Sequence, residues 1–263
     1  MTQDFSQRYG PWAVVTGASS GIGEAFAHAL AKRGVRSLLL ARRANELLRV
    51  ADEVRKASGV ECTTLAADLA DPGFIDALEE RTQDLDVGLV VSNAGYNPVG
   101  TFAERTREEL CRILDVNCRA PLLLAHAFRP RLLARGRGGF LITGSVEGFF
   151  GVPHSAPYAA SKNYVLALGE ALWGESLDTD IDVLVLAPST TDTAIIRARN
   201  MQNYPGIMQP AEVAEHGLLQ LREGPVTVPG EANREMVAGL AAMPRTQAVV
   251  TMGKAMAAAM QGS

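Results

Sequence analysis

Residues 12–23 read WAVVTGASSGIG, a short apolar run that leads into a glycine-rich turn and then into an amphipathic stretch. The glycines of the turn are Gly17, Gly21 and Gly23, in the spacing G-x-x-x-G-x-G. Glycine lets the backbone bend sharply and approach a ligand closely, and the amides at the start of the following helix attract an anion. The stretch therefore predicts a strand, a tight turn and a helix that together bind the pyrophosphate of a dinucleotide.

The same alternation of short and long segments continues along the chain. Short aliphatic runs predict strands at 12–16, 37–41, 62–66, 87–92, 139–143, 181–187 and 225–228. Longer amphipathic stretches predict helices at 23–33, 44–58, 73–82, 108–133, 157–177 and 210–222. This order predicts an α/β fold, a Rossmann-type doubly wound sheet of about seven parallel strands with helices on both faces and its ligand at the carboxyl ends of the strands.

Length and composition fit one globular domain over residues 1–263. The chain has 263 residues, 47% of them hydrophobic and 21% charged, and no linker, repeat or low-complexity tract divides it. A formal net charge of -4 gives no reason to expect a nucleic-acid partner. Residues 1–10 lack an apolar signal core, and no apolar run reaches the roughly 20 residues that span a bilayer.

The three cysteines, Cys62, Cys111 and Cys118, lack the spacing of metal ligands. We therefore expect neither a disulfide framework nor a bound metal. Together with the composition, this favours a reducing compartment, the cytoplasm.

A basic pair, Arg42 and Arg43, follows the second predicted strand about 20 residues beyond the glycines. An acidic residue at this place would select the ribose of NAD, whereas a guanidinium pairs with the 2′-phosphate of NADP. Ser19 and Ser20 add hydroxyls in the glycine turn. An exposed pair in a loop is the alternative, but the position favours NADP(H) as the cofactor.

Tyr158 and Lys162 lie four residues apart in a predicted helix, thirteen residues after Ser145. Positions i and i+4 share one face of a helix, so the ammonium is expected beside the phenol. A neighbouring positive charge favours the phenolate, and we expect it to lower the pKa of Tyr158 towards the range of a general acid or base. Ser145, on another segment, could hold the oxygen of a substrate.

Taken together, these motifs resemble the short-chain dehydrogenase/reductase family. The resemblance extends from about Trp12 to about Thr193 and rests on Thr16 to Gly23, Asp68-Leu69, Asn93-Ala94-Gly95, Asn117, Ser145, Tyr158 and Lys162. The Ala41-Arg42-Arg43 and Leu172-Trp173-Gly174-Glu175 segments resemble bacterial 3-oxoacyl reductases within that family.

The resemblance implies four catalytic residues. Tyr158 would donate a proton to a carbonyl or accept one from an alcohol, and Ser145 would bind the same oxygen. Lys162 would hold the nicotinamide ribose and tune Tyr158. Asn117 would lie at an irregularity of its helix and keep a water for proton relay.

The resemblance also implies a cofactor site. Asp68 and Leu69 would border the adenine, Asn93, Ala94 and Gly95 would pass its ribose, and Pro188 with Thr191 or Thr193 would meet the nicotinamide. The complete expected set is Gly17, Ser19, Ser20, Gly21, Ile22, Gly23, Arg42, Arg43, Asp68, Leu69, Asn93, Ala94, Gly95, Tyr158, Lys162, Pro188, Thr191 and Thr193. Ser189 stands where the family commonly has glycine, which puts the fit of the nicotinamide ring in doubt.

The remaining candidates concern the substrate. Residues 191–208 mix apolar side chains with Arg197 and Arg199, which predicts a lid over a hydrophobic substrate; the arginines would bind an anionic group or face water. Glu147, Phe149, Phe150 and His154 are candidate pocket residues. The methionine-rich tail, with Met243, Met252, Met256 and Met260, predicts either a subunit contact or a helix on the chain's own core.

The sequence thus predicts an NADP(H)-dependent oxidoreductase that transfers a hydride between nicotinamide and a fairly hydrophobic ketone or secondary alcohol. Reduction of a C=N bond, redox epimerisation on the same Ser-Tyr-Lys set, a non-catalytic NADP(H) sensor and a structural protein of the same fold are the alternatives. Family members often form homodimers or homotetramers through the helices that hold Asn117 and Tyr158, so either assembly is expected.

Overall fold

Parallel strands form the centre of the molecule. The computed structural model describes residues 2–201 and 204–261, and within them seven strands form one sheet in the order β3-β2-β1-β4-β5-β6-β7. They are β1 (Trp12–Thr16), β2 (Arg36–Ala41), β3 (Cys62–Ala66), β4 (Val87–Ser92), β5 (Gly138–Thr143), β6 (Ile181–Leu186) and β7 (Val226–Thr227), and all neighbours are parallel. The predicted fold is confirmed, and each predicted strand agrees with the observed one to within one residue at either end.

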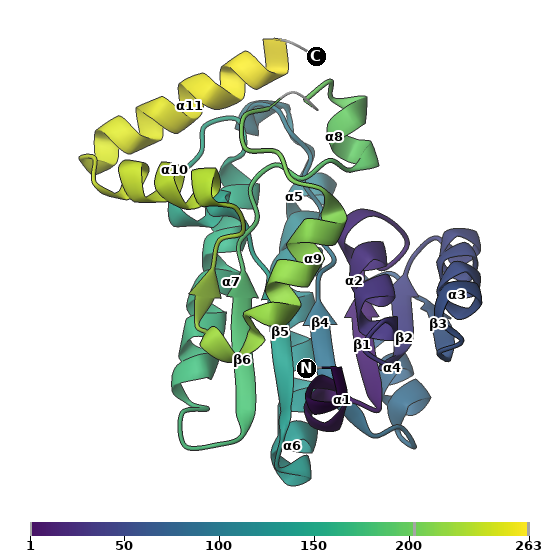
Figure 1. The fold of residues 1–263 in the computed structure, drawn as a ribbon. Coiled ribbons are helices and arrows are strands. Elements are labelled where there is room, and N and C mark those ends of the chain that lie inside the picture. Colours follow the sequence, from purple (N-terminus) through teal and green to yellow (C-terminus); the bar gives the residue numbers. More distant parts are fainter. Residues whose placement is uncertain (1, 202–203, 262–263) are drawn as a thin grey trace.

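Both faces of the sheet are buried, because successive side chains of a strand point to opposite sides. In β1, Ala13 and Val15 belong to one apolar cluster and Val14 to the other. The first cluster is covered by α2 (Gly21–Ala31), α3 (Ala44–Ser58) and α9 (Pro210–Leu219), and the second by α4 (Phe74–Thr82), α6 (Ala120–Arg135) and α7 (Ala156–Gly174). Figure 1 shows these helices on the two sides of the sheet.

The helix predicted over 108–133 is irregular in its middle. It consists of α5 (Arg107–Leu114), a π-helical segment (Asp115–Arg119) and α6, which follow one another without a break. A π segment inserts an extra residue into the helix and often accompanies a functional site. It contains Asn117, so the predicted irregularity at this residue is present.

The two ends of the chain lie at opposite ends of the sheet (Figure 1). Helix α1 (Thr2–Tyr9), which the sequence did not predict, lies by the amino ends of the strands, and the Tyr9 hydroxyl donates a 2.6 Å hydrogen bond to Asp182 in β6. Three helices lie at the carboxyl ends: α8 (Ala194–Ala198), α10 (Glu231–Ala241) and α11 (Arg245–Gln261). Leu240 and Met252 pack there against Phe150, which fastens the tail to its own subunit.

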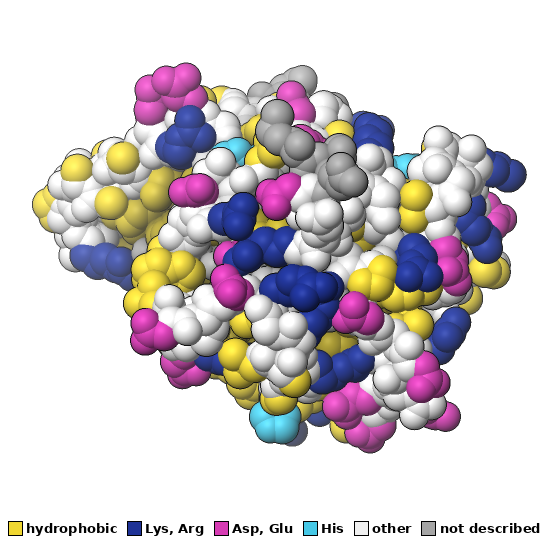
Figure 2. Space-filling model, turned by 60° about the horizontal axis from the view of Figure 1, so that its bottom comes forward, with side chains coloured by type: hydrophobic (Ala, Val, Ile, Leu, Met, Phe, Trp, Pro, Cys, Tyr) yellow, Lys and Arg dark blue, Asp and Glu magenta, His cyan; other side chains and the backbone are white. Residues whose placement is uncertain are grey.

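Basic and acidic side chains are intermingled on the face shown in Figure 2. Ion pairs of the structure include Arg8 with Asp182 and Arg135 with Asp86, the latter with a nitrogen–oxygen distance of 2.7 Å. No helix among residues 2–201 and 204–261 is long and apolar enough to cross a membrane.

Candidate active site

The glycine turn is held against the end of β4. Gly17 and Gly21 have φ values of +67° and +61°, which favour glycine. A Cβ atom on Gly23 would lie 2.3 Å from the Gly17 oxygen, so this position accepts no side chain. The Thr16 hydroxyl oxygen accepts hydrogen bonds from the backbone nitrogens of Asn93 and Ala94, at 3.0 and 3.1 Å. The turn is therefore rigid and open towards the start of α2, as an anion site requires.

Arg43 reaches back over this turn. Its guanidinium donates hydrogen bonds of 3.0 Å to the Ser19 hydroxyl and 2.8 Å to the Ser20 hydroxyl. Arg42 lies beside it and is also exposed. Two guanidinium groups and two hydroxyls at the end of β2 are the chemistry that binds a phosphate monoester, so these residues fit the 2′-phosphate of NADP(H).

Asp68 forms an ion pair that the sequence did not indicate. Its carboxylate accepts hydrogen bonds of 2.9 and 2.7 Å from Arg112 in α5, and its Oδ1 accepts a third from the backbone of Ala70. Partial burial opposes ionisation, but Arg112 and the Ala70 amide outweigh it and lower the pKa of Asp68. This pairing fixes the loop after β3, and the predicted contact of Asp68 with an adenine stays a prediction.

A single cavity of about 660 Å³ joins most of the predicted residues at the carboxyl ends of the strands. All predicted cofactor residues except Gly23 line it, and so do Ser145, Tyr158 and Lys162. Ser189, the departure from the family pattern, also lines it. The cavity therefore brings together the phosphate-binding turn and the Ser-Tyr-Lys set, which lie more than a hundred residues apart in the sequence.

Asn117 lies behind the cavity rather than in its wall. The side chain is 1% exposed, and its Oδ1 accepts a 2.8 Å hydrogen bond from the backbone of Tyr96. Its Nδ2 donates to the Tyr96 oxygen at 3.0 Å and to the Ser161 hydroxyl at 2.9 Å. The amide thus links the loop after β4 to α7, next to Lys162. The predicted part of Asn117 in a proton relay stays a prediction.

Ser145, Tyr158 and Lys162 meet where β5 ends and α7 begins. Ser145 follows β5 and starts a short 3-10 turn (Val146–Phe149), and its hydroxyl lies near enough to Tyr158 to affect the pKa of that phenol. The Lys162 ammonium donates a 2.7 Å hydrogen bond to the oxygen of Thr143 and lies 5.5 Å from the centre of the Tyr158 ring. The arrangement places two hydroxyls and an ammonium on one wall of the cavity.

The structure corrects the expected pKa of Tyr158. Burial and the neighbouring carboxyl of Glu147 raise this pKa above its usual value, and the Ser145 hydroxyl and the charge of Arg199 only partly oppose them. Lys162, whose ammonium donates to Thr143, is not among the groups that shift it. Burial also lowers the pKa of Lys162 itself, to about 8. The prediction that Lys162 lowers the pKa of Tyr158 is therefore wrong for the protein without cofactor.

The segment 191–208 closes on itself at one side of the cavity. Residues 202 and 203 lie outside the described residues. Thr191 forms a parallel bridge with Met208, and Asp192 donates its backbone N–H to the Met208 oxygen at 2.9 Å. Arg197 pairs with Asp192 at 2.7 Å, whereas Arg199 lines the cavity and donates to the Asn97 oxygen. The two arginines, which the sequence did not distinguish, therefore have different surroundings.

Helices α10 and α11 complete the apolar wall. Met236, Met252 and Met256 line the cavity together with Ile195, Ile196 and Met201 of the preceding segment. Of the two readings of the tail, a helix on the chain's own core agrees with these contacts. Of the other candidate pocket residues, Glu147 lines the cavity, while Phe149, Phe150 and His154 are not among the lining residues.

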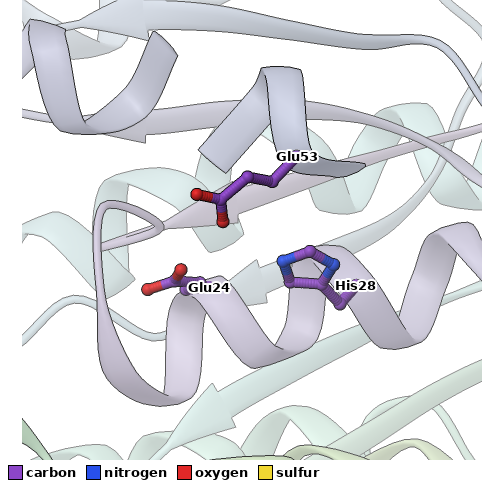
Figure 3. Close-up of side chains that lie close together, drawn as sticks. All are labelled: Glu24, His28 and Glu53. Atoms are coloured by element: carbon purple, nitrogen blue, oxygen red, sulfur yellow. The ribbon is translucent and has the colours of Figure 1, made fainter. Parts of the chain in front are cut away.

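Glu24, His28 and Glu53 come together on α2 and α3 (Figure 3). Arg49 already supplies positive charge there, since its Nη1 donates 2.9 Å hydrogen bonds to both Glu24 and Glu53. The cluster therefore carries no assignment as a metal site.

Known proteins share this arrangement. The chain matches the family described as short chain dehydrogenase over residues 11–203. It is 32% identical over 255 residues to the 7beta-hydroxysteroid dehydrogenase of Clostridium sardiniense, across 95% of this chain and 97% of that protein. A solved 7beta-hydroxysteroid dehydrogenase superposes with a TM-score of 0.88 at 25% identity, covering 94% of this chain and 98% of the other. A short-chain dehydrogenase from Sphingobium yanoikuyae in complex with NADPH superposes with a TM-score of 0.79 at 33% identity. The match covers 87% of this chain and 92% of the other.

The chain therefore belongs to the short-chain dehydrogenase/reductase family, as the motifs predicted. It is an NAD(P)-dependent oxidoreductase of CH–OH and C=O groups. The Sphingobium relative holds NADPH, and the chemistry of the Arg43 site fits the extra phosphate of that cofactor.

Proposed function

We propose that the protein is an NADPH-dependent carbonyl reductase that acts on a fairly hydrophobic ketone, with the secondary alcohol as product. The observation that carries this proposal is the shared cavity, which joins Arg43 and the glycine turn at one end to Ser145, Tyr158 and Lys162 at the other. Its methionine and isoleucine lining supports an apolar substrate. The similarity to hydroxysteroid dehydrogenases supports the same class.

In this proposal the chain's own residues bind and protonate the substrate oxygen. The Ser145 hydroxyl donates a hydrogen bond to the carbonyl oxygen, and the Tyr158 hydroxyl gives that oxygen a proton as negative charge develops on it. The high pKa of Tyr158 keeps this proton in place until it is needed. The reduced nicotinamide, when bound, supplies the hydride. An ammonium has three donors, so Lys162 can hold the nicotinamide ribose while it remains bonded to Thr143.

The cofactor and positioning residues have separate tasks in the proposal. Arg42, Arg43, Ser19 and Ser20 bind the 2′-phosphate, the amides at Gly21 to Gly23 bind the pyrophosphate, and Asp68 with Leu69 borders the adenine. Asn93 to Gly95 line the ribose, and Pro188, Thr191 and Thr193 lie at the nicotinamide.

The experiment measures absorbance at the nicotinamide band while the protein meets ketones, 3-oxoacyl esters and cyclic imines, with NADPH and separately with NADH. We expect NADPH to be oxidised with hydrophobic ketones. Turnover confined to imines would replace the ketone with a C=N substrate. Tight NADPH binding without turnover of any compound would favour a sensor over an enzyme.

We further propose that residues 1–263 form one domain and that segment 191–208 acts as its lid. Ile195 supports the lid, since it lines the cavity although it is 62% exposed, and the Thr191–Met208 bridge offers a hinge. Limited proteolysis within this segment should slow when NADPH and substrate are both present. Cleavage at an unchanged rate would refute the lid.

A homodimer or homotetramer is the proposed assembly. Leu114, Leu122 and Tyr164, on α5, α6 and α7, are large apolar side chains with exposed fractions of 56%, 43% and 38%. These helices include or adjoin the Asn117 and Tyr158 segments, where family members associate. Light scattering should therefore give a dimer or tetramer at micromolar concentration, and a monomer would contradict it. The free thiols of Cys62, Cys111 and Cys118 suit the proposed cytoplasmic location, which cell fractionation would test.

A further inference from the structure

Glu147 is an acidic side chain in the wall of the cavity, two residues beyond Ser145. It belongs to the 3-10 turn that follows β5, and its backbone N–H donates a 3.2 Å hydrogen bond to the Ser145 hydroxyl. The carboxyl is close enough to Tyr158 for its charge to raise the tyrosine pKa. Glu147 therefore lines the same part of the cavity as Ser145 and Tyr158, and the proposed reaction gives it no task.

The carboxyl of Glu147 lacks the partner that a buried acid requires. Its Oε2 atom is buried and has no hydrogen-bond partner among residues 2–201 and 204–261. Ser155 lies near enough to lower the glutamate pKa, but its hydroxyl is likewise buried without a partner in hydrogen-bonding geometry. A buried polar atom without a partner costs about 1 to 3 kcal/mol. Because Glu147 lines the cavity, a rotation of its side chain that brings this atom to a ligand's hydrogen-bonding group would gain binding free energy.

The charges around Glu147 indicate which ligand group fits. Burial raises the pKa of Glu147, while Arg199 and Lys162 act in the opposite direction; Tyr158 and Tyr204 are the other titratable groups it affects. The two basic side chains, Arg199 and Lys162, would repel a cationic ligand group, and the carboxylate of Glu147 would repel an anionic one. A hydroxyl suits Glu147 in either protonation state, because it can both donate and accept a hydrogen bond.

We propose that Glu147 is a specificity-determining residue that hydrogen-bonds a hydroxyl group of the substrate close to the reacting carbonyl. The substrate class is then a hydrophobic ketone that carries a hydroxyl, and a diol in the reverse direction. This inference rests on the proposed carbonyl reductase function and narrows its substrate.

The test uses pairs of ring ketones that differ only by one hydroxyl, placed at successive positions from the carbonyl carbon. We expect the wild type to prefer the hydroxylated member at one position by at least about tenfold in kcat/KM, since a site built for a hydroxyl rejects the analogue that lacks it. In Glu147→Leu the two members should differ by less than about twofold, with turnover of the plain ketone retained. Glu170→Gln, a change at an exposed position of α7, is the control and should keep the wild-type preference.

A second variant tests the inference if Glu147→Leu does not fold. Glu147→Asp keeps the acid and withdraws it by one methylene, so it should lose most of the preference while NADPH binding stays unchanged. Absence of a preference in the wild type, or an equal loss for both ketones in the variants, would overturn the role of Glu147 alone. Failure of every ketone to react would overturn the proposed function, and this inference with it.

Discussion

The ammonium of Lys162 donates a 2.7 Å hydrogen bond to the oxygen of Thr143, in a site where the lysine is only 3% exposed. The bond ties α7 to the end of β5, with the ammonium 5.5 Å from the centre of the Tyr158 ring. One hydrogen bond does not replace the water that the ammonium loses on burial. The pKa of Lys162 therefore falls from 10.5 to about 8 in the folded protein without cofactor.

We predict that Lys162 makes the stability of the cofactor-free protein depend on pH. Below about pH 8 the lysine is charged in the folded and in the unfolded protein, so the free energy of unfolding is reduced by the full cost of burying the charge. Between about pH 8 and the unfolded value of 10.5 the unfolded chain binds more protons, so this contribution to the free energy of unfolding rises with pH, by on the order of 2 kcal/mol.

Denaturant unfolding of wild type and Lys162→Met from pH 7.5 to 10 checks this. The stability of the wild type relative to the variant should increase over that range, and subtraction removes the other titrating groups, Cys62 and Tyr158. A difference that stays constant with pH would contradict a lowered lysine pKa.

Arg43→Ala should weaken NADPH binding by about tenfold to a hundredfold, because hydrogen bonds to charged groups contribute about 1.5 to 3 kcal/mol. NADH has no 2′-phosphate, so its affinity should change by less than about twofold. Arg42→Asp should likewise weaken NADPH binding relative to NADH binding. Fluorescence titration with both cofactors measures it, with the exposed Arg107→Ala as control. An equal loss for NADPH and NADH would remove Arg43 from 2′-phosphate recognition.

Gly23→Ala should impair both folding and cofactor binding. Its Cβ would lie 2.3 Å from the Gly17 oxygen and 2.7 Å from the Asn93 Nδ2, so the turn would have to open. Gly174→Ala, at the end of α7, meets nothing within 4 Å and should be neutral or stabilise by about 0.5 to 1 kcal/mol. Melting temperatures and NADPH titrations of the two variants measure stability and cofactor affinity after the same glycine-to-alanine change at the two positions. Wild-type NADPH affinity in Gly23→Ala would argue against the tight turn.

Glu147→Gln should move the pH profile of alcohol oxidation. Oxidation requires Tyr158 without its proton, and the charge of Glu147 raises the tyrosine pKa. Loss of that charge lowers the pKa, so the acid side of the kcat/KM profile should shift to lower pH. Glu170→Gln should leave the profile in place. A shift to higher pH, or none, would show that Glu147 does not act on Tyr158.

The central elements could be predicted because strands such as β1 and β4 bury both faces and helices such as α3 bury one, and both patterns are visible in the sequence. Helix α1 was missed because residues 2–9 are mostly polar; its contact with Asp182 depends on a residue more than 170 positions away. Arg112 gave no signal for the same reason, since its partner Asp68 lies 44 positions earlier.

The positions of the site residues could be predicted where a motif determines the local backbone. Their pKa values and hydrogen-bond partners could not, because these depend on burial and on residues distant in the sequence. Spacing places Tyr158 and Lys162 on one helix, but it does not reveal that the ammonium is bonded to Thr143 or that Glu147 lies beside the phenol. The methionines of α10 and α11 likewise could have covered a neighbour or the chain's own cavity, because their amphipathic pattern is the same in both cases.

Transfer of deuterium from C4-deuterated NADPH to a hydrophobic ketone, read by mass spectrometry of the alcohol, tests the central claim most directly. We predict that the wild-type product gains one deuterium at the carbinol carbon. Tyr158→Phe should bind NADPH with unchanged affinity and lose at least a hundredfold in rate, the lower end of what a general acid contributes. Equal transfer by wild type and Tyr158→Phe, or tight NADPH binding by the wild type without any transfer, would contradict the account.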